Sequence, residues 1–132
     1  MNRNRPESLA EVATRINHGE PMSNAVGEFL DSFYGSEPER KASMVAEEPE
    51  AICSDDERTS SVRAAYLSAV AEALAYWGGF PAPPWVFQKR FFLEKPWFAT
   101  DIEGLRPLLL AESPVFFRRR NLYVSGNALS RA

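Results

Sequence analysis

The sequence predicts a mainly α-helical fold, a compact bundle of five to six helices around a central helix at about residues 57–77. Two observations support this prediction. Apolar residues recur at three- and four-residue spacing, and signals for helix starts and helix ends bracket several of these stretches. A third observation limits it, because the prolines of residues 80–98 forbid a continuous helix there. The length of 132 residues favours one helical domain over residues 1–132.

Three helices are expected in the first fifty residues. Ser8–Glu11 and Ser36–Glu39 each have the spacing of a capping box, in which the serine and the glutamate bind free amides at a helix start. Between them, the apolar residues from Met22 to Phe33 form one stripe at helical spacing. The expected helices are about 8–18 before Gly19, 22–34 before Gly35, and 36–48 before Pro49.

The strongest periodic pattern belongs to the central helix. Acidic residues 55–57 favour the positive end of its dipole, and Gly78-Gly79 ends it. Arg63, Ser68 and Glu72 lie off its apolar stripe. That stripe comprises Val62, Tyr66, Ala69, Val70, Ala73, Leu74 and Trp77. We therefore expect the other helices to pack against this one.

The pattern changes after the central helix. Nine of the 16 aromatic residues fall between Tyr76 and Phe98. A disordered linker would not carry so many rings, so we expect an ordered, irregular segment with a short helical turn around 85–90. Beyond it, the capping-box spacing Thr100–Glu103 predicts a helix that runs to about Glu112. A short helix is expected from Ser113-Pro114 through Phe116 and Phe117. Asn121 should end it, and an extended piece should follow over Leu122–Val124.

The charge is distributed unevenly along the chain. Residues 1–60 carry 13 acidic and six basic side chains, a net charge of −7, whereas residues 61–132 carry five acidic and nine basic side chains, a net charge of +4. Such a split is typical of two surfaces with different partners or of two halves that attract each other. Ordinary solvated faces are a simpler explanation of the split than either of these.

The residues that commonly carry chemistry are scarce. The sequence has no phosphate-binding glycine loop and no protease, hydrolase or CxxC motif. Its one cysteine, Cys53, and one histidine, His18, cannot build a usual zinc site. Acidic neighbours disfavour the reactive thiolate of Cys53, so we expect a small core or boundary residue there. His18 is expected to interact with the C-terminal dipole of the first helix.

Two acidic clusters, Glu47–Glu50 and residues 55–57, are candidate cation sites. Neither has the spacing of a calcium-binding loop, and solvated faces or helix N-terminal charge explain them better. The sequence therefore predicts no catalytic residues, no metal site, no cofactor and no enzymatic activity.

The expected location is the cytoplasm. The first residues include arginines but no apolar stretch that would make a signal peptide. The apolar runs are far shorter than the roughly 20 residues that cross a bilayer, so no membrane association is expected. A single cysteine fits a reducing compartment.

Arg118, Arg119 and Arg120 form the sharpest local signal, because guanidinium groups bind phosphates and carboxylates in forked geometry. On a helix these residues point about 100° apart, so at least one should turn inward toward an acid such as Glu103 or Glu112. Together with exposed rings they would form a docking surface rich in residues that dominate binding energy. The predicted partner-binding residues are Trp85, Arg90, Trp97, Phe98, Arg118, Arg119 and Arg120.

Three stretches carry a resemblance to other proteins: the AYLSAVAE run of Ala65–Glu72, the PWF motif of Pro96–Phe98, and Leu105–Ala132. Over residues 62–132 the chain resembles a family of short, uncharacterised bacterial proteins. These are similar to the small partners found beside nucleotidyltransferase-like toxins in toxin–antitoxin pairs. The resemblance implies an antitoxin-like or accessory role and carries over no functional residues.

The leading hypothesis is a non-catalytic protein-binding module that neutralises a toxin enzyme by occlusion. The alternative is a nucleic-acid-binding regulator that uses the Arg118–Arg120 patch, joined by neighbouring Lys and Arg side chains, with Trp85 or Trp97 stacked on a base. The acidic overall balance counts against it. A small enzyme with an unrecognised site is the third possibility. The partner's identity and the oligomeric state stay open.

Overall fold

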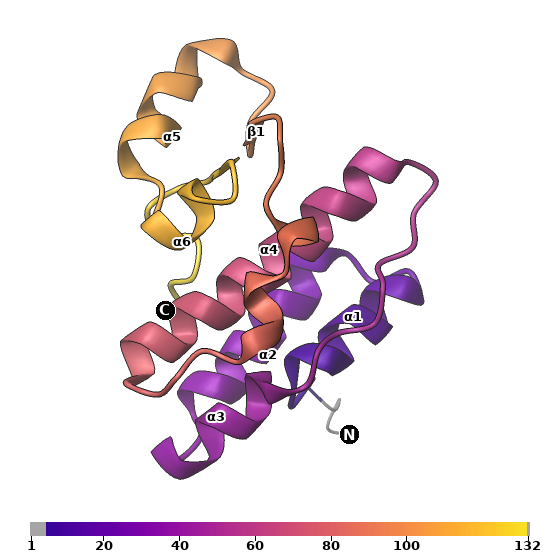
Figure 1. Ribbon diagram of the computed structural model, residues 1–132, viewed down its shortest axis with the longest axis vertical. Coiled ribbons are helices and arrows are strands. Elements are labelled where there is room, and N and C mark those ends of the chain that lie inside the picture. Colours follow the sequence, from indigo (N-terminus) through magenta and orange to yellow (C-terminus); the bar gives the residue numbers. More distant parts are fainter. Residues whose placement is uncertain (1–4, 132) are drawn as a thin grey trace.

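The computed structural model describes residues 5–131, and it is mainly helical, as the sequence predicts (Figure 1). The helices are α1 (Leu9–Asn17), α2 (Met22–Tyr34), α3 (Pro38–Ala46), α4 (Glu57–Gly78), α5 (Arg106–Glu112) and α6 (Val115–Arg118). Three short 3₁₀ turns, η1 (Pro84–Phe87), η2 (Lys89–Phe91) and η3 (Glu103–Leu105), and two strands, β1 (Trp97–Phe98) and β2 (Leu122–Tyr123), complete the described elements.

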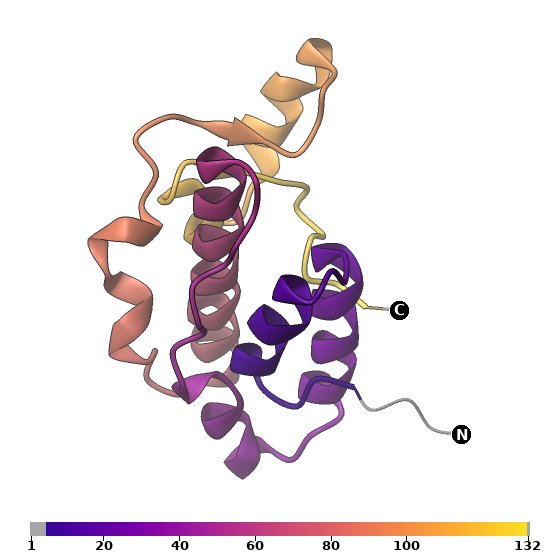
Figure 2. The same cartoon turned by 90° about the vertical axis from the view of Figure 1, so that its right-hand side faces the viewer.

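Helix α4 is the centre of the fold, as expected. Figure 2 shows it between α1 and α2 on one side and the turns η1 and η2 on the other. Its middle is therefore covered on more than one face, and small alanines allow the close approach. The buried α4 positions are Val62, Ala65, Leu67, Ser68, Ala69, Val70, Ala71, Glu72, Ala73, Leu74 and Ala75.

Two expectations about the stripe of α4 were wrong. Ser68 and Glu72, placed off the apolar stripe, are buried, because the C-terminal part of the chain covers that face. Trp77, placed on the stripe, is exposed together with Tyr76, because the last turn of α4 extends beyond the segments that cover its middle.

Most helix ends follow the predicted signals. The Ser8 hydroxyl accepts a hydrogen bond from the Glu11 amide at 3.2 Å, which confirms this cap. The Asp56 carboxylate accepts the amides of Arg58 and Thr59 at the start of α4. Gly79 ends α4 in the left-handed region, with φ of 76°.

The other two capping boxes do not form as predicted. Ser36 donates its hydroxyl to the carbonyl of Ser32 at 2.7 Å, so it closes α2 instead of capping α3. Helix α5 begins at Arg106, six residues beyond Thr100. The reason is Pro107, which fits the first turn of a helix but would break the interior of a longer one.

The short turns after α4 and the ending of α6 agree with the sequence. Asn121 has a φ of 63° and turns the chain from α6 into β2, which confirms the predicted stop and the extended piece after it. Its parallel partner β1 was not predicted; Trp97 pairs with Leu122 and Phe98 with Tyr123. A two-residue parallel pair joins segments 25 residues apart, and local spacing carries no signal for it.

One hydrophobic core joins the N-terminal helices to the end of the chain. It extends from Phe29 and Phe33 of α2, through α4, to Phe117, Leu122 and Leu129. Within residues 5–131 none of the helices combines the length and the apolar character that crossing a bilayer requires.

Candidate functional site

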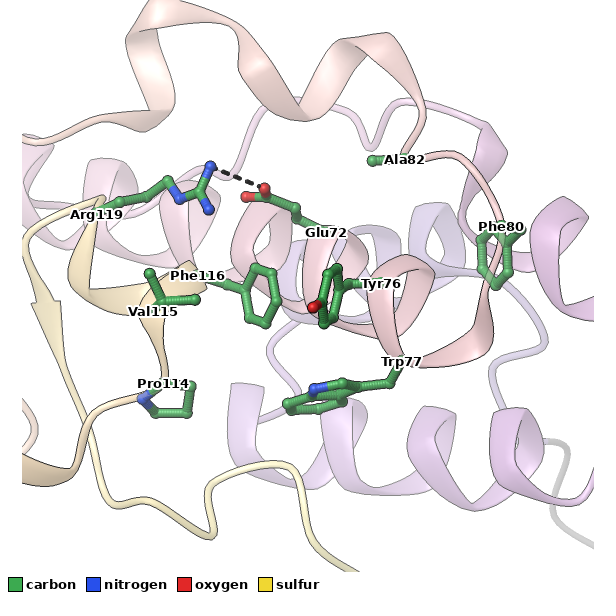
Figure 3. Close-up of a pocket in the computed structure, with 9 residues that line it drawn as sticks. All are labelled: Glu72, Tyr76, Trp77, Phe80, Ala82, Pro114, Val115, Phe116 and Arg119. Atoms are coloured by element: carbon green, nitrogen blue, oxygen red, sulfur yellow. Dashed lines mark ion pairs between the residues drawn. The ribbon is translucent and has the colours of Figure 1, made fainter.

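A concave surface lies between the C-terminal end of α4 and α6, and we call it the aromatic groove (Figure 3). Its volume is about 620 Å³. It is lined by Glu72, Tyr76, Trp77, Phe80, Ala82, Pro114, Val115, Phe116 and Arg119.

Three of the rings that line the groove, those of Tyr76, Trp77 and Phe116, pack against one another. Tyr76 and Trp77 are 73% and 54% exposed, whereas Phe116 of α6 is buried between them and the body of the protein. The Phe116 ring centroid lies 5.4 Å from that of Tyr76 and 5.8 Å from that of Trp77, the latter pair at right angles. Phe116 therefore supports two rings that face solvent (Figure 3).

Trp77 and Pro114 also line a second hollow of about 490 Å³. The other residues that line it are Tyr34, Gly126, Leu129, Ser130 and Arg131. The exposed indole therefore contributes to two neighbouring concave surfaces.

The other end of the groove is charged. Glu72 binds two arginines through its carboxylate: Oε2 lies 3.1 Å from Nη1 of Arg119, and Oε1 lies 2.7 Å from Nη1 of Arg120. The Arg119 side chain is 44% exposed and lies 5.8 Å from the Phe116 ring centroid. The groove therefore combines an apolar surface with one partly exposed cation, visible beside Glu72 in Figure 3.

Arg120 is fully buried and joins three elements. Besides Glu72, its guanidinium donates to the Ser68 hydroxyl at 2.7 Å and to the carbonyls of Val86 and Phe116 at 2.8 and 2.9 Å. Burial lowers the pKa of Arg120, and the hydrogen bond to Glu72 opposes that shift. Since an arginine keeps its charge, the buried guanidinium needs these acceptors, and it holds η1 and α6 against α4.

The arginine run is thus divided between different roles. The expectation that one arginine turns inward toward an acid is confirmed by Arg120, but the acid is Glu72, because α6 crosses α4 there. The expected acids are elsewhere: Glu103 is exposed, and Glu112 accepts the Gly126 amide. Arg118 is exposed, so the three side chains do not form one common surface patch.

Arg120 and Trp85 were predicted to bind a partner, and as direct surface contacts both predictions were wrong. Trp85 is 7% exposed, and its indole Nε1–H donates to the carbonyl of Val45 at 3.0 Å. It fixes η1 to α3, because a buried indole needs an acceptor.

Arg90, Trp97 and Phe98, which were also predicted to bind a partner, do not line the groove. Arg90 binds Glu48 and lies over the Phe91 ring. Trp97 and Phe98 are half-buried in β1, where Phe98 stacks on Tyr123 at 5.0 Å. Of the seven predicted residues, only Arg119 lines the groove.

Sequence reasoning missed Tyr76 and Trp77 as surface residues. The signal was the change from small residues to two large rings directly before Gly78-Gly79. Alanines recur through the buried middle of α4, and the largest rings come where the helix ends.

The sequence placed Cys53 in the core or at its boundary, which was wrong. The residue lies in the surface segment before α4, where its amide donates to Asn17 Oδ1 at 2.8 Å and the residue stays exposed.

His18 caps α1, and its Nδ1 lies 2.7 Å from the carbonyl of Thr14, which fits the expected interaction with the helix end. In the part of the chain that the structure describes, no three His, Cys, Asp or Glu side chains converge as metal ligands.

The arrangement of the groove suits binding. Both carboxylate oxygens of Glu72 are taken by arginines, and the rest of the lining is mostly apolar. An apolar, partly exposed concave surface with a few convergent polar groups is typical of recognition sites. No protein-family model, curated protein or solved structure matches this chain.

Proposed function

We propose that this chain is a non-catalytic protein-binding domain whose aromatic groove receives an apolar segment of a partner protein. The exposure of Tyr76 and Trp77 on the well-packed support of Phe116 is the observation that carries the proposal. Tyrosine and tryptophan supply much of the binding energy at protein interfaces, and adjacent exposed rings leave apolar area that a partner would remove from water.

The charged end of the groove supports this proposal. Arg119 offers its exposed guanidinium N–H groups to a carboxylate or carbonyl of the partner, next to the apolar rings. Such a contact would orient the bound segment. Because Arg120 fixes α6 to α4, the two walls of the groove are held in place before binding, which reduces the entropy cost of association.

The resemblance to partners of nucleotidyltransferase-type toxins suggests what the partner is. In this proposal the chain acts in the cytoplasm as an antitoxin-like or accessory protein, and it docks on a toxin enzyme so that substrate cannot enter. The groove would supply the contact and the body of the domain would supply the obstruction.

Co-expression with the product of the neighbouring gene tests the proposal. The two proteins should co-purify, and growth inhibition by the neighbour should be relieved. Trp77→Ala should weaken binding by about tenfold or more, measured by titration calorimetry, because it removes an anchor residue. Phe87→Ala is the matched control, since Phe87 is half-exposed but does not line the groove, and it should bind like the wild type.

Two results would contradict the proposal. If the neighbour's product neither co-purifies with the chain nor is neutralised by it, the antitoxin-like role fails. If the two proteins bind and Trp77→Ala behaves like Phe87→Ala, the groove is not the binding site.

A further inference from the structure

A second apolar surface lies on the segment before α6. We call residues 101–110, which include η3 and most of α5, the acidic arm. Ile102, Leu105 and Leu108 are spaced three residues apart and are 60%, 44% and 55% exposed. Figure 1 shows α5 and the loop before it projecting from the rest of the molecule. Exposed leucines on a projecting helix are typical of contact with another chain.

The charges of the arm and the groove are complementary. Asp101 and Glu103 are exposed next to the apolar residues of the arm, and Arg106, also exposed, has its Cζ 4.9 Å from the Phe98 ring centroid, so the arm carries one net negative charge. At the charged end of the groove Glu72 offsets one of the two arginines that it binds, Arg119 and Arg120, which leaves one net positive charge. Arg118 is exposed on the same helix as Phe116 and adds a second positive charge. The opposite net charges of the arm and the groove would speed the encounter of two chains, and they would help to align the arm in the groove.

The arm is held away from the groove of its own chain. Ser113 lies between α5 and α6 and is buried. Its hydroxyl lies 2.7 Å from the Leu109 carbonyl and 2.9 Å from the Val124 carbonyl, and its oxygen accepts the Val124 amide at 2.7 Å. Leu109 is buried as well. These contacts fix the base of the arm in the projecting position that Figure 1 shows.

We propose that two copies of this chain associate about a two-fold axis, with the acidic arm of each copy in the aromatic groove of the other. Figure 1 shows α5 and the C-terminal end of α4 on the same side of the molecule, as a self-complementary interface requires. Leu105 and Leu108 would contact Tyr76 and Trp77, and Asp101 or Glu103 would face Arg119. This association does not rest on the proposed function, and it would cover the groove until another partner displaces the arm.

Sedimentation velocity and light scattering on the full chain test this inference. The wild type should be a dimer of the 14.8 kDa chain at about 100 μM, and it should dissociate more readily in high salt. Leu108→Glu on the arm and Trp77→Ala in the groove should each raise the dimer dissociation constant by about tenfold or more. Leu110→Glu is the control, because Leu110 is also exposed on α5 but lies about 200° around the helix from Leu108.

Mixing the two variants identifies the arrangement. A Leu108→Glu chain keeps its groove and a Trp77→Ala chain keeps its arm, so the mixed pair retains one intact arm–groove contact. The mixture should associate more tightly than either variant alone. The inference is overturned if the wild type is monomeric at that concentration, if Leu110→Glu dissociates the dimer as strongly as Leu108→Glu, or if mixing restores nothing.

The same variants separate this inference from the proposed function. Leu108→Glu should bind the neighbouring gene's product at least as well as the wild type, because its groove is intact and uncovered. Trp77→Ala should lose both associations. If the wild type is monomeric but still binds the neighbouring gene's product through Trp77, the dimer inference is wrong and the proposed function is supported.

Discussion

The helical body, α1–α4, and the C-terminal segment, residues 80–131, are stabilised by different means. The body has helices of nine to 22 residues with apolar faces, whereas the segment has helices and strands of two to seven residues, too short to be stable alone. Besides the apolar residues that it adds to the core, polar side chains hold it in place. These are the buried Arg120 and Ser113, and the half-buried Asn121, which donates to the Leu93 carbonyl at 2.8 Å. Short elements that are anchored by hydrogen bonds can turn large apolar side chains outward, as the arm does.

The largest effect on the C-terminal segment is expected from Arg120→Met. The variant leaves the Glu72 carboxylate, the Ser68 hydroxyl and the carbonyl of Val86 without their buried donor. We expect a loss of about 3–5 kcal/mol in the free energy of unfolding, measured by urea denaturation. Hydrogen exchange should show the amides of 115–124 losing protection before those of α1 and α2.

Two further variants test this interpretation. Arg118→Met, two residues before Arg120 and exposed, should change the free energy of unfolding by about 0.5 kcal/mol or less. Adding Glu72→Met to Arg120→Met should recover part of the loss, because it removes a buried carboxylate that only Arg119 would still bind. Equal effects of the Arg118 and Arg120 changes would show that the buried guanidinium is not the anchor of the segment.

A smaller effect is expected at the joint between α5 and α6. Ser113→Ala removes the acceptor of the Val124 amide in a buried position, which should cost about 1–3 kcal/mol in unfolding free energy. Ser130→Ala is the matched control on an exposed serine and should be near neutral. If the two variants unfold at the same urea concentration, the hydrogen bonds of Ser113 do not hold the base of the arm.

The smallest expected effect is a pH dependence of the contact between body and segment. Gln88 and Arg90 hydrogen-bond the Glu48 carboxylate and hold its pKa below the usual range. The lowered pKa means that Glu48 stabilises the fold above the pKa it has in the unfolded chain, about 4.3, and that this contribution disappears as the pH falls through the lower folded value.

The urea midpoints of the wild type and Glu48→Gln, measured from pH 6 to pH 3, test this dependence. The wild type should be slightly more stable at pH 6, and the difference should vanish at the acidic end. Glu47→Gln, on the neighbouring exposed residue, should show no such convergence. A constant difference between wild type and Glu48→Gln across this range would disprove the ionic contact.

The sequence predicted the body better than the segment. The apolar spacing and the glycines placed α1, α2 and α4 within a residue or two, and the stop at Asn121 was also predicted. The predicted helix starts at Ser36 and Thr100 were wrong. The capping-box spacing is present at both, but a proline in the first turn sets where each helix begins. Such spacing shows which hydrogen bonds can form, and the backbone near a proline decides which of them do.

The candidate site was predicted only in part. Arg119 was identified as a contact residue and does line the groove, and one inward arginine was expected from the 100° step of a helix. Tyr76 and Trp77 were not identified, because periodicity assigned Trp77 to the buried stripe. Burial at the end of a helix depends on whether another segment extends that far, and apolar spacing does not report this.

By itself the sequence determined that the chain forms capped helices around α4, because helix formation and its end signals are local properties of apolar spacing, glycine and proline. Only the tertiary structure decided that Glu72 and Arg120 are buried while Trp77 and Leu108 face solvent. The physical reason is that burial is set by which distant segments cover a residue. The crossing of α6 over α4 brings residues 48 positions apart into one ion pair and leaves the rings beside it uncovered.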